Sequence, residues 1–156
     1  MNGSTPYKEQ VLNHDGLLAL PVSVREALWL AAAHAQLNAY APYSRFQVGA
    51  AVLDDRGQIH AGCNVENAAY PQGVCAEAGA LSAMVLAGGR RLHAVLVLGD
   101  GEAWVTPCGG CRQKIREFAH PQVPVLLADR QGLRGVLTLE ALLPHSFGPE
   151  HLSQTI

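Results

Sequence analysis

The chain has 156 residues, 49% of them hydrophobic and 15% charged, which is typical of one globular domain with a single core. Its formal net charge of −2 and the lack of a basic stripe argue against a nucleic-acid partner. The polar N-terminus has no apolar region of the secretory type, and no stretch is long enough to cross a bilayer, so we expect a cytoplasmic protein without a membrane partner.

The N-terminal half predicts an arm, a helix and a hairpin. Residues 1–20 should form a polar arm, and a single domain should occupy residues 21–156. Ser23 and Glu26 have the spacing of a capping box, in which each side chain satisfies a free backbone donor at a helix start. The expected elements are a helix over 23–39, strands over 46–53 and 58–63, and a turn at 54–57 between the strands.

The C-terminal half alternates helices with strands. Gly88 and Gly89 should end one helix, and Thr106 followed by Pro107 has the pattern of an N-cap with proline at the first helical position. The expected elements are a helix over 75–87, a strand over 93–98, a helix over 108–119, a strand over 123–128, and a short strand and helix around 136–143. Strands separated by helices predict parallel pairing, whereas the hairpin is antiparallel. The sequence therefore predicts an α/β fold, a three-layer α/β/α sandwich with a mixed five-stranded sheet.

Three of the four cysteines lie at the starts of two predicted helices. Cys75 opens the first of these helices, and Cys108 and Cys111 open the second. Residues three apart share a helix face, so the sulfurs of Cys108 and Cys111 can reach one ion. Free N–H groups at a helix start favour thiolates, and cytoplasmic thiols stay reduced. Three thiolates plus a water is the open arrangement of catalytic zinc.

This spacing alone leaves other interpretations open. The Cys-x-x-Cys pair also suits a redox couple, and Cys63 could close a structural zinc site or simply be a small buried residue. The seven histidines are scattered, and none repeats at metal-ligand spacing. Glu77 favours a catalytic site, because two residues after Cys75 it can reach the open position and move a proton. A carboxylate in a first turn also suits the helix dipole, however.

Four motifs resemble those of the cytidine deaminase family in its small, three-cysteine form. They are Ala-Pro-Tyr-Ser-Arg-Phe-Gln-Val-Gly-Ala-Ala at 41–51, Cys-Asn-Val-Glu-Asn-Ala-Ala-Tyr at 63–70, Cys-Ala-Glu at 75–77, and Pro-Cys-Gly-Gly-Cys-Arg-Gln at 107–113. The similarity runs in register over residues 23–129, and residues 142–147 resemble the family's C-terminal segment. The resemblance implies a cytidine deaminase-like fold.

The resemblance also implies an activity: zinc-dependent hydrolysis of cytidine or deoxycytidine to uridine or deoxyuridine and ammonia, in pyrimidine salvage. Cys75, Cys108 and Cys111 would hold one Zn²⁺ per subunit, with Glu77 as the proton shuttle. The residues that it implies in substrate binding are Phe46 on the pyrimidine ring, Asn64 and Glu66 on the ribose 3′-hydroxyl, Ala76 through its backbone N–H, and Tyr70 and Phe147 in a neighbouring subunit's site. The expected partners are a small nucleoside and further copies of the chain, in a homotetramer.

The chain departs from this pattern at Ala78. The family often has an arginine directly after the catalytic glutamate, where it hydrogen-bonds the zinc thiolates. Without it, we expect Arg112, or else Arg45, to hydrogen-bond a ligand sulfur and offset the negative charge. Two rival functions stay open: deamination of a modified cytosine nucleoside, a free base or a blasticidin-type nucleoside, and a non-catalytic zinc-stabilised binding module. The sequence does not rank cytidine against deoxycytidine, since both have the 3′-hydroxyl.

Overall fold

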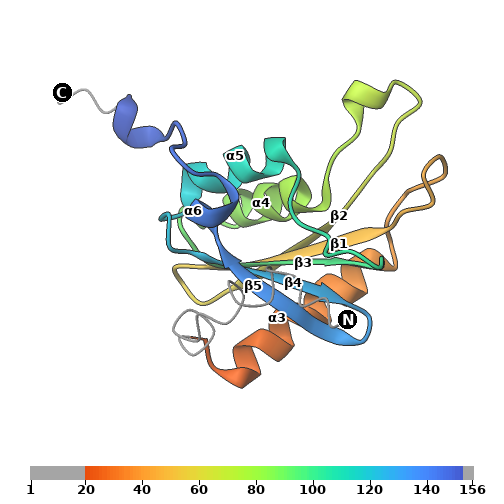
Figure 1. Ribbon diagram of the computed structural model, residues 1–156, viewed down its shortest axis with the longest axis horizontal. Helices are drawn as coiled ribbons and strands as arrows, with labels where there is room; N and C mark the ends of the chain where they lie inside the picture. The colour runs from red at the N-terminus through yellow and green to blue at the C-terminus, as the bar shows by residue number, and fades with distance from the viewer. Residues whose placement is uncertain (1–19, 153–156) are drawn as a thin grey trace, which may run out of the picture.

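In the computed structural model, which describes residues 20–152, helices cover both faces of one five-stranded sheet (Figure 1). The strands are β1 (Val48–Asp54), β2 (Ile59–Cys63), β3 (Leu92–Gly99), β4 (Pro124–Asp129) and β5 (Gly132–Thr138). The helices are α3 (Val22–Gln36), α4 (Ala76–Leu86), α5 (Gly109–Phe118) and α6 (Leu139–Leu142), with 3₁₀ turns η1 (Tyr70–Gln72) and η2 (Pro149–His151). The polar arm predicted at 1–20 lies, apart from Leu20, outside the described residues. No helix within 20–152 has the length and apolar character to cross a membrane.

The sheet is mixed, as predicted, with the strand order β2-β1-β3-β4-β5. β1 pairs antiparallel with both β2 and β3, β3 pairs parallel with β4, and β4 pairs antiparallel with β5. The prediction that strands connected by a helix pair in parallel is therefore confirmed for β3 and β4 only. The connection from β2 through α4 to β3 passes over β1, so these two strands run in the same direction without pairing.

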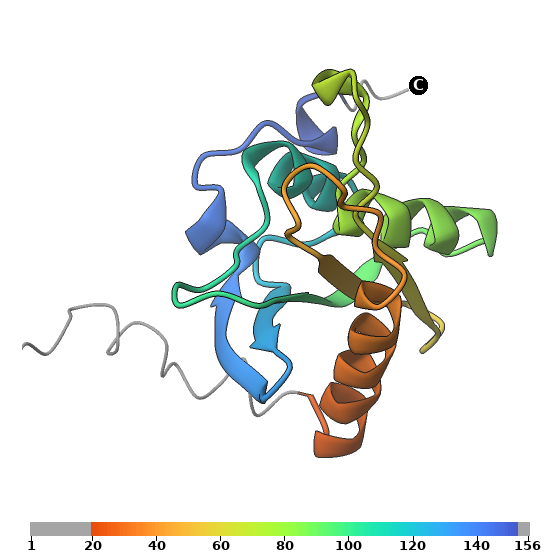
Figure 2. The same cartoon turned by 90° about the vertical axis from the view of Figure 1, so that its right-hand side faces the viewer.

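Two apolar cores separate three layers, which confirms the predicted α/β/α sandwich. On one face, α3 contributes Leu28 and packs against Leu96 of β3. On the other face, α4, α5 and α6 form the second layer, in which Met84 and Ile115 pack against Val95. Successive residues of a strand point to opposite faces, so a strand covered on both sides is apolar throughout, as β3 is. Figure 1 and Figure 2 show α3 alone below the sheet and the other helices above it.

Two predicted helix starts are wrong. α3 begins at Val22 with Pro21 at the N-cap, so Ser23 lies inside the first turn and no capping box forms with Glu26. α5 begins at Gly109 with Cys108 at the N-cap, and the hydroxyl of Thr106 instead accepts a hydrogen bond from Arg112. In both cases the residue at the N-cap makes no capping hydrogen bond with its side chain.

Gly62 of β2 sets how closely the start of α4 approaches the sheet. A Cβ at this position would lie 2.5 Å from the carbonyl oxygen of Ala76 and would overlap the backbone nitrogen of Ala80. Real side chains do not fit such a gap, so only glycine allows β2 and α4 to meet backbone to backbone. The close approach places Cys75 and Glu77 at a fixed height above the sheet.

Gly62→Ala is therefore expected to destabilise the protein by about 1–3 kcal/mol, the usual effect of overpacking, and to weaken zinc binding because α4 must shift. Thermal unfolding with and without a chelator measures both effects. Gly57→Ala is the control. Its φ of +75° strains an alanine and should lower stability, but nothing lies within 4 Å of a Cβ there, so zinc content should not change. An unchanged melting temperature and zinc content in Gly62→Ala would contradict this role.

Candidate active site

The three predicted cysteine ligands converge at the N-terminal ends of α4 and α5. Cys75 and Cys108 are the N-cap residues of these helices, and Cys111 lies in the first turn of α5. Their sulfur atoms all lie within 4.8 Å of one another, and the Sγ atoms of Cys75 and Cys108 are 3.7 Å apart. Tetrahedral zinc with Zn–S bonds of about 2.3 Å requires sulfurs roughly 3.8 Å apart, so Cys75 and Cys108 already have the spacing that zinc requires and Cys111 lies near enough to join them.

No fourth protein ligand completes the cluster within residues 20–152. Cys63 is partly buried at the end of β2, where it pairs with Gly49 of β1, and it does not join the three sulfurs. No described histidine joins them either. Three thiolates and one open position match a catalytic zinc site, and the closed structural site that Cys63 would have completed does not form.

Glu77 lies beside this open cluster in the first turn of α4. Its side chain is 4% exposed, and the thiol of Cys111 donates to its Oε2 across 3.4 Å. Burial raises the pKa of Glu77, against smaller opposing effects that include the Cys111 hydrogen bond. A carboxylate that only favours a helix dipole stays in solvent, whereas this one is buried against the metal ligands. Glu77 therefore has the position and the environment of an acid–base group.

The thiols at this site do not ionise equally. Burial raises the pKa of Cys111 strongly, and the Glu77 carboxylate adds to that effect. Burial also opposes ionisation of Cys108, but hydrogen bonds from the backbone and thiol of Cys111 outweigh it and lower the pKa of Cys108. Three thiolates next to a carboxylate concentrate negative charge, which a divalent cation neutralises. The soft sulfur donors select zinc over hard cations such as Mg²⁺ or Ca²⁺.

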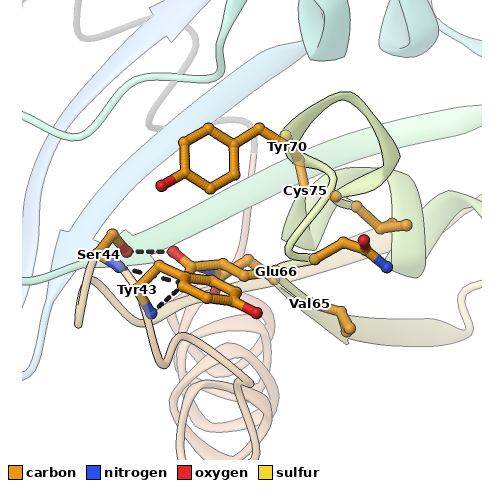
Figure 3. A pocket seen from close by; sticks show the side chains of 10 residues that line it. Tyr43, Ser44, Val65, Glu66, Tyr70 and Cys75 are labelled. Carbon is orange, nitrogen blue, oxygen red and sulfur yellow. Dashed lines mark hydrogen bonds between the residues drawn. The ribbon is translucent and has the colours of Figure 1, made fainter.

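A pocket of about 480 Å³ opens beside Cys75 (Figure 3). It is lined by Tyr43, Ser44, Asn64, Val65, Glu66, Asn67, Tyr70, Gly73, Val74 and Cys75. Cys75 belongs to both the pocket wall and the sulfur cluster, so a molecule in the pocket reaches the metal ligands. The volume is in the range of small-ligand sites.

Glu66 holds the turn at the rim of this pocket. Its carboxylate accepts hydrogen bonds from the backbone N–H groups of Tyr43 and Ser44 and from the Ser44 hydroxyl (Figure 3). The Ser44 hydroxyl bond makes the largest contribution to lowering the pKa of Glu66, so the group is a carboxylate at neutral pH. These three bonds use three of about four acceptor positions, which leaves one for a ligand hydroxyl.

Asn64 ties the end of β2 to the entry of β1. Its amide oxygen accepts from the backbone N–H of Val48 across 2.8 Å, and its amide nitrogen donates to the carbonyl of Phe46 across 2.9 Å. The amide keeps one N–H and one lone pair for a ligand. Asn64 and Glu66 are thus both fixed by backbone groups and still able to bind a ligand.

A family model matches most of the chain. It is described as the cytidine and deoxycytidylate deaminase zinc-binding region, and it matches residues 23–127.

The chain belongs to this deaminase family.

The chain is 45% identical over 119 residues to the cytidine deaminase of Sporosarcina psychrophila, an alignment that covers 76% of this chain and 88% of the relative. It is 39% identical over 128 residues to the cytidine deaminase of Mycobacterium tuberculosis (strain H37Rv), covering 78% of this chain and 87% of the relative. Among solved structures, a cytidine deaminase from Burkholderia pseudomallei superposes with a TM-score of 0.73 at 42% identity, covering 78% of this chain and 98% of that chain.

The structure brings some residues of the predicted deaminase site together and separates others. Asn64, Glu66, Tyr70 and Cys75 line the same pocket, whereas Phe46 does not line it and is 40% exposed. Ala76 is fully buried in the first turn of α4. Phe147 is 55% exposed and stacks on His151.

The segments that carry Tyr70 and Phe147 lie far apart. Figure 1 shows η1 and η2 projecting at opposite ends of the helical layer, and Figure 2 shows both projecting beyond the sheet. Tyr70 is 77% exposed and meets Tyr43, with ring centroids 6.1 Å apart.

The predicted hydrogen bond from Arg112 to a ligand sulfur is wrong. The Arg112 guanidinium donates to the carbonyls of Pro107 and Leu142, across 2.8 and 2.7 Å, and to the hydroxyl of Thr106. Arg112 therefore ties the loop before Cys108 to the C-terminal segment. Arg45, the second candidate, is exposed and has a positive φ of 57°.

Sequence reasoning also missed the part that Tyr43 and Ser44 play. They lie within the motif at 41–51 that resembles the deaminase family, and in the structure they line the pocket and bind Glu66. The available signal was a serine next to a tyrosine in a proline-containing turn, since such turns place short hydroxyl side chains near backbone groups.

Proposed function

We propose that this deaminase hydrolyses the 4-amino group of cytidine and deoxycytidine, as a cytoplasmic enzyme of pyrimidine salvage. The observation that carries the proposal is the convergence of three cysteine sulfurs and the buried Glu77 beside a nucleoside-sized pocket. Asn64 and Glu66 give that pocket fixed polar groups suited to a sugar hydroxyl.

The chemistry needs a nucleophile and a proton carrier. Cys75, Cys108 and Cys111 would hold zinc, which when bound would supply an activated water. Glu77 takes a proton from the attacking water as oxygen adds to C4 of the cytosine ring, and gives that proton to N3. Glu77 then carries the second proton from the new hydroxyl to the amine, which leaves as ammonia. One water is consumed, and the ring becomes that of uridine.

Each proposed binding residue has a distinct task. The Phe46 ring does not line the pocket in the single chain, but its carbonyl accepts from the pocket residue Asn64, and we assign the ring to packing on the bound pyrimidine. The backbone N–H of Ala76 donates to the base. The remaining amide N–H of Asn64 donates a hydrogen bond to the ribose 3′-hydroxyl. That hydroxyl in turn donates a hydrogen bond to the free acceptor position of Glu66. Because both side chains are held by backbone hydrogen bonds, little conformational entropy is lost when the sugar binds.

Steady-state turnover of a substrate series tests this assignment. Cytidine and deoxycytidine should both be deaminated, whereas free cytosine should react poorly. 3′-Deoxycytidine should be turned over with a kcat/KM at least about 10-fold lower, because without the 3′-hydroxyl Asn64 and Glu66 are left without a partner. Faster turnover of cytosine, or of a blasticidin-type nucleoside alone, would contradict the assignment.

We further propose a homotetramer in which Tyr70 and Phe147 each complete a neighbouring subunit's site. Both side chains are largely exposed in the single chain, and their segments lie at opposite ends of the molecule (Figure 1). An aromatic side chain in this position is available to another copy of the chain, and closed symmetry lets every copy give and receive it.

Subunit complementation tests the shared site. Glu77→Gln and Phe147→Ala chains, each nearly inactive alone, should regain activity when co-expressed in one oligomer. With random mixing, about one quarter of the sites would combine an intact Glu77 with a neighbour's intact Phe147. The two proteins expressed separately are the controls. No recovery in a mixed oligomer, or a fully active monomer in sedimentation at assay concentration, would exclude the shared site.

A further inference from the structure

Arg116 of α5 is a buried cation, 8% exposed, whose partners all belong to the C-terminal segment, residues 142–151. Its Nε donates to the hydroxyl of Ser146 across 2.9 Å, and its Nη2 forms an ion pair with Glu150. Within residues 20–152 the guanidinium makes no other hydrogen bond. A buried charge without partners is costly, so Arg116 strongly favours the observed position of this segment against α5.

The two residues that Arg116 binds lie on either side of Phe147 in the sequence. Between them, Gly148 passes so close to Arg116 that a Cβ at this position would lie 2.5 Å from the guanidinium carbon Cζ. Gln113, three residues before Arg116 on α5, donates to the carbonyl of Phe147 across 3.0 Å. The backbone of Phe147 is therefore held on α5, while its ring stays 55% exposed.

We propose that Arg116 is a positioning residue, which fixes Phe147 in the place where a neighbouring subunit's active site receives its ring. This inference rests on the shared site proposed above. α5 also carries Cys111, five residues before Arg116. One helix thus holds a metal ligand of its own site and the segment that completes the next subunit's site. Arg116 acts on the reaction of the neighbour and not on that of its own chain.

Arg116 differs from the other α5 side chains that bind the C-terminal segment. Arg112 and Gln113 donate to backbone carbonyls, which remain whatever side chains the segment has. Arg116 instead binds two side chains, those of Ser146 and Glu150. The Glu150 side chain is 57% exposed, so Glu150→Ala removes the ion pair without changing the packing of α5.

Subunit complementation tests whose site Arg116 serves. Arg116→Met keeps most of the length of the side chain and removes its hydrogen bonds. Alone, it should lower kcat/KM for cytidine by about 10–100-fold, since a misplacement of about 1 Å can have an effect of this size. Co-expressed with Glu77→Gln in one oligomer, it should regain activity, because an intact Glu77 can then meet a correctly held Phe147 from the other chain. Co-expressed with Phe147→Ala it should regain none, because no chain in that mixture presents Phe147 correctly.

Amide hydrogen exchange, measured without substrate, gives a readout that does not depend on activity. Exchange over residues 142–151 should be faster in Arg116→Met and in Glu150→Ala, whereas exchange in α5 should match the wild type. Glu117→Ala is the matched control, because Glu117 is exposed beside Arg116 on α5 and forms no ion pair within residues 20–152. It should leave both exchange and kcat/KM unchanged.

The outcomes separate this inference from the proposed function. Unchanged exchange over 142–151 in both variants, or recovery of Arg116→Met by Phe147→Ala, would overturn the role of Arg116. So would a failure of Arg116→Met to recover with Glu77→Gln when Phe147→Ala does recover with it, and the shared site would then stand. No recovery in either pairing would remove the shared site and this inference together. If α5 also exchanges faster in Arg116→Met, Glu150→Ala decides by the same criteria. A wild type that leaves cytidine unchanged would remove the proposed function itself.

Discussion

Glu77→Gln is expected to lower kcat on cytidine by about 10²–10⁴-fold while zinc content and fold are retained. The substitution conserves shape, so the buried site beside Cys111 stays filled. An amide cannot accept the proton of the attacking water or return it to the ring. Loss of proton transfer lowers kcat, whereas KM depends on groups that remain in place, such as Asn64 and Glu66.

Three measurements on Glu77→Gln separate chemistry from structure: kcat, zinc per chain and melting temperature. Glu26→Gln is the matched control, because Glu26 is exposed on α3, on the opposite face of the sheet. It should match the wild type in all three. Near wild-type turnover by Glu77→Gln would remove Glu77 from the proposed proton transfer.

Cys75→Ala is expected to lose both zinc and activity. The three cysteines are the whole set of candidate ligands in residues 20–152, and removing Cys75 leaves two at the start of a single helix. Loss of a direct ligand should weaken zinc binding by more than the roughly 10–100-fold that loss of an outer partner causes. Zinc per chain after dialysis against a weak chelator measures the effect directly.

Cys63→Ala provides the matched control for this result. Cys63 is a thiol in the same region of the chain, but it lies outside the sulfur cluster. Its variant should therefore keep zinc and activity. Full zinc occupancy in Cys75→Ala would show that the third ligand is another residue, such as Cys63 or a histidine.

The metal cluster could be predicted from the sequence because each of its two halves is local and the family resemblance joins them. Cys108 and Cys111 are separated by the spacing of one helical turn, and Cys75 and Glu77 belong to another helix start. The three layers could also be predicted, because the pattern of apolar residues along each helix and strand indicates which of its faces is buried.

Contacts between distant segments could not be predicted. Thr106 does not cap α5 because its hydroxyl binds Arg112, and Arg112 in turn binds Leu142, 30 residues later. The Arg112 guanidinium binds backbone carbonyls and no sulfur, because the C-terminal segment places the carbonyl of Leu142 2.7 Å from it. The bonds that Asn64 and Glu66 make to the backbone of residues 43–48 depend on the same kind of tertiary placement.

The most direct test of the account is the loss of cytidine absorbance on adding the purified protein, with zinc per chain measured on the same sample. We predict steady conversion of cytidine to uridine, about one zinc per chain, and loss of conversion in parallel with zinc when a chelator is added. A protein that holds zinc and leaves cytidine unchanged would contradict the account, and would leave a deaminase of another amine and a zinc-stabilised binding module as the two remaining functions.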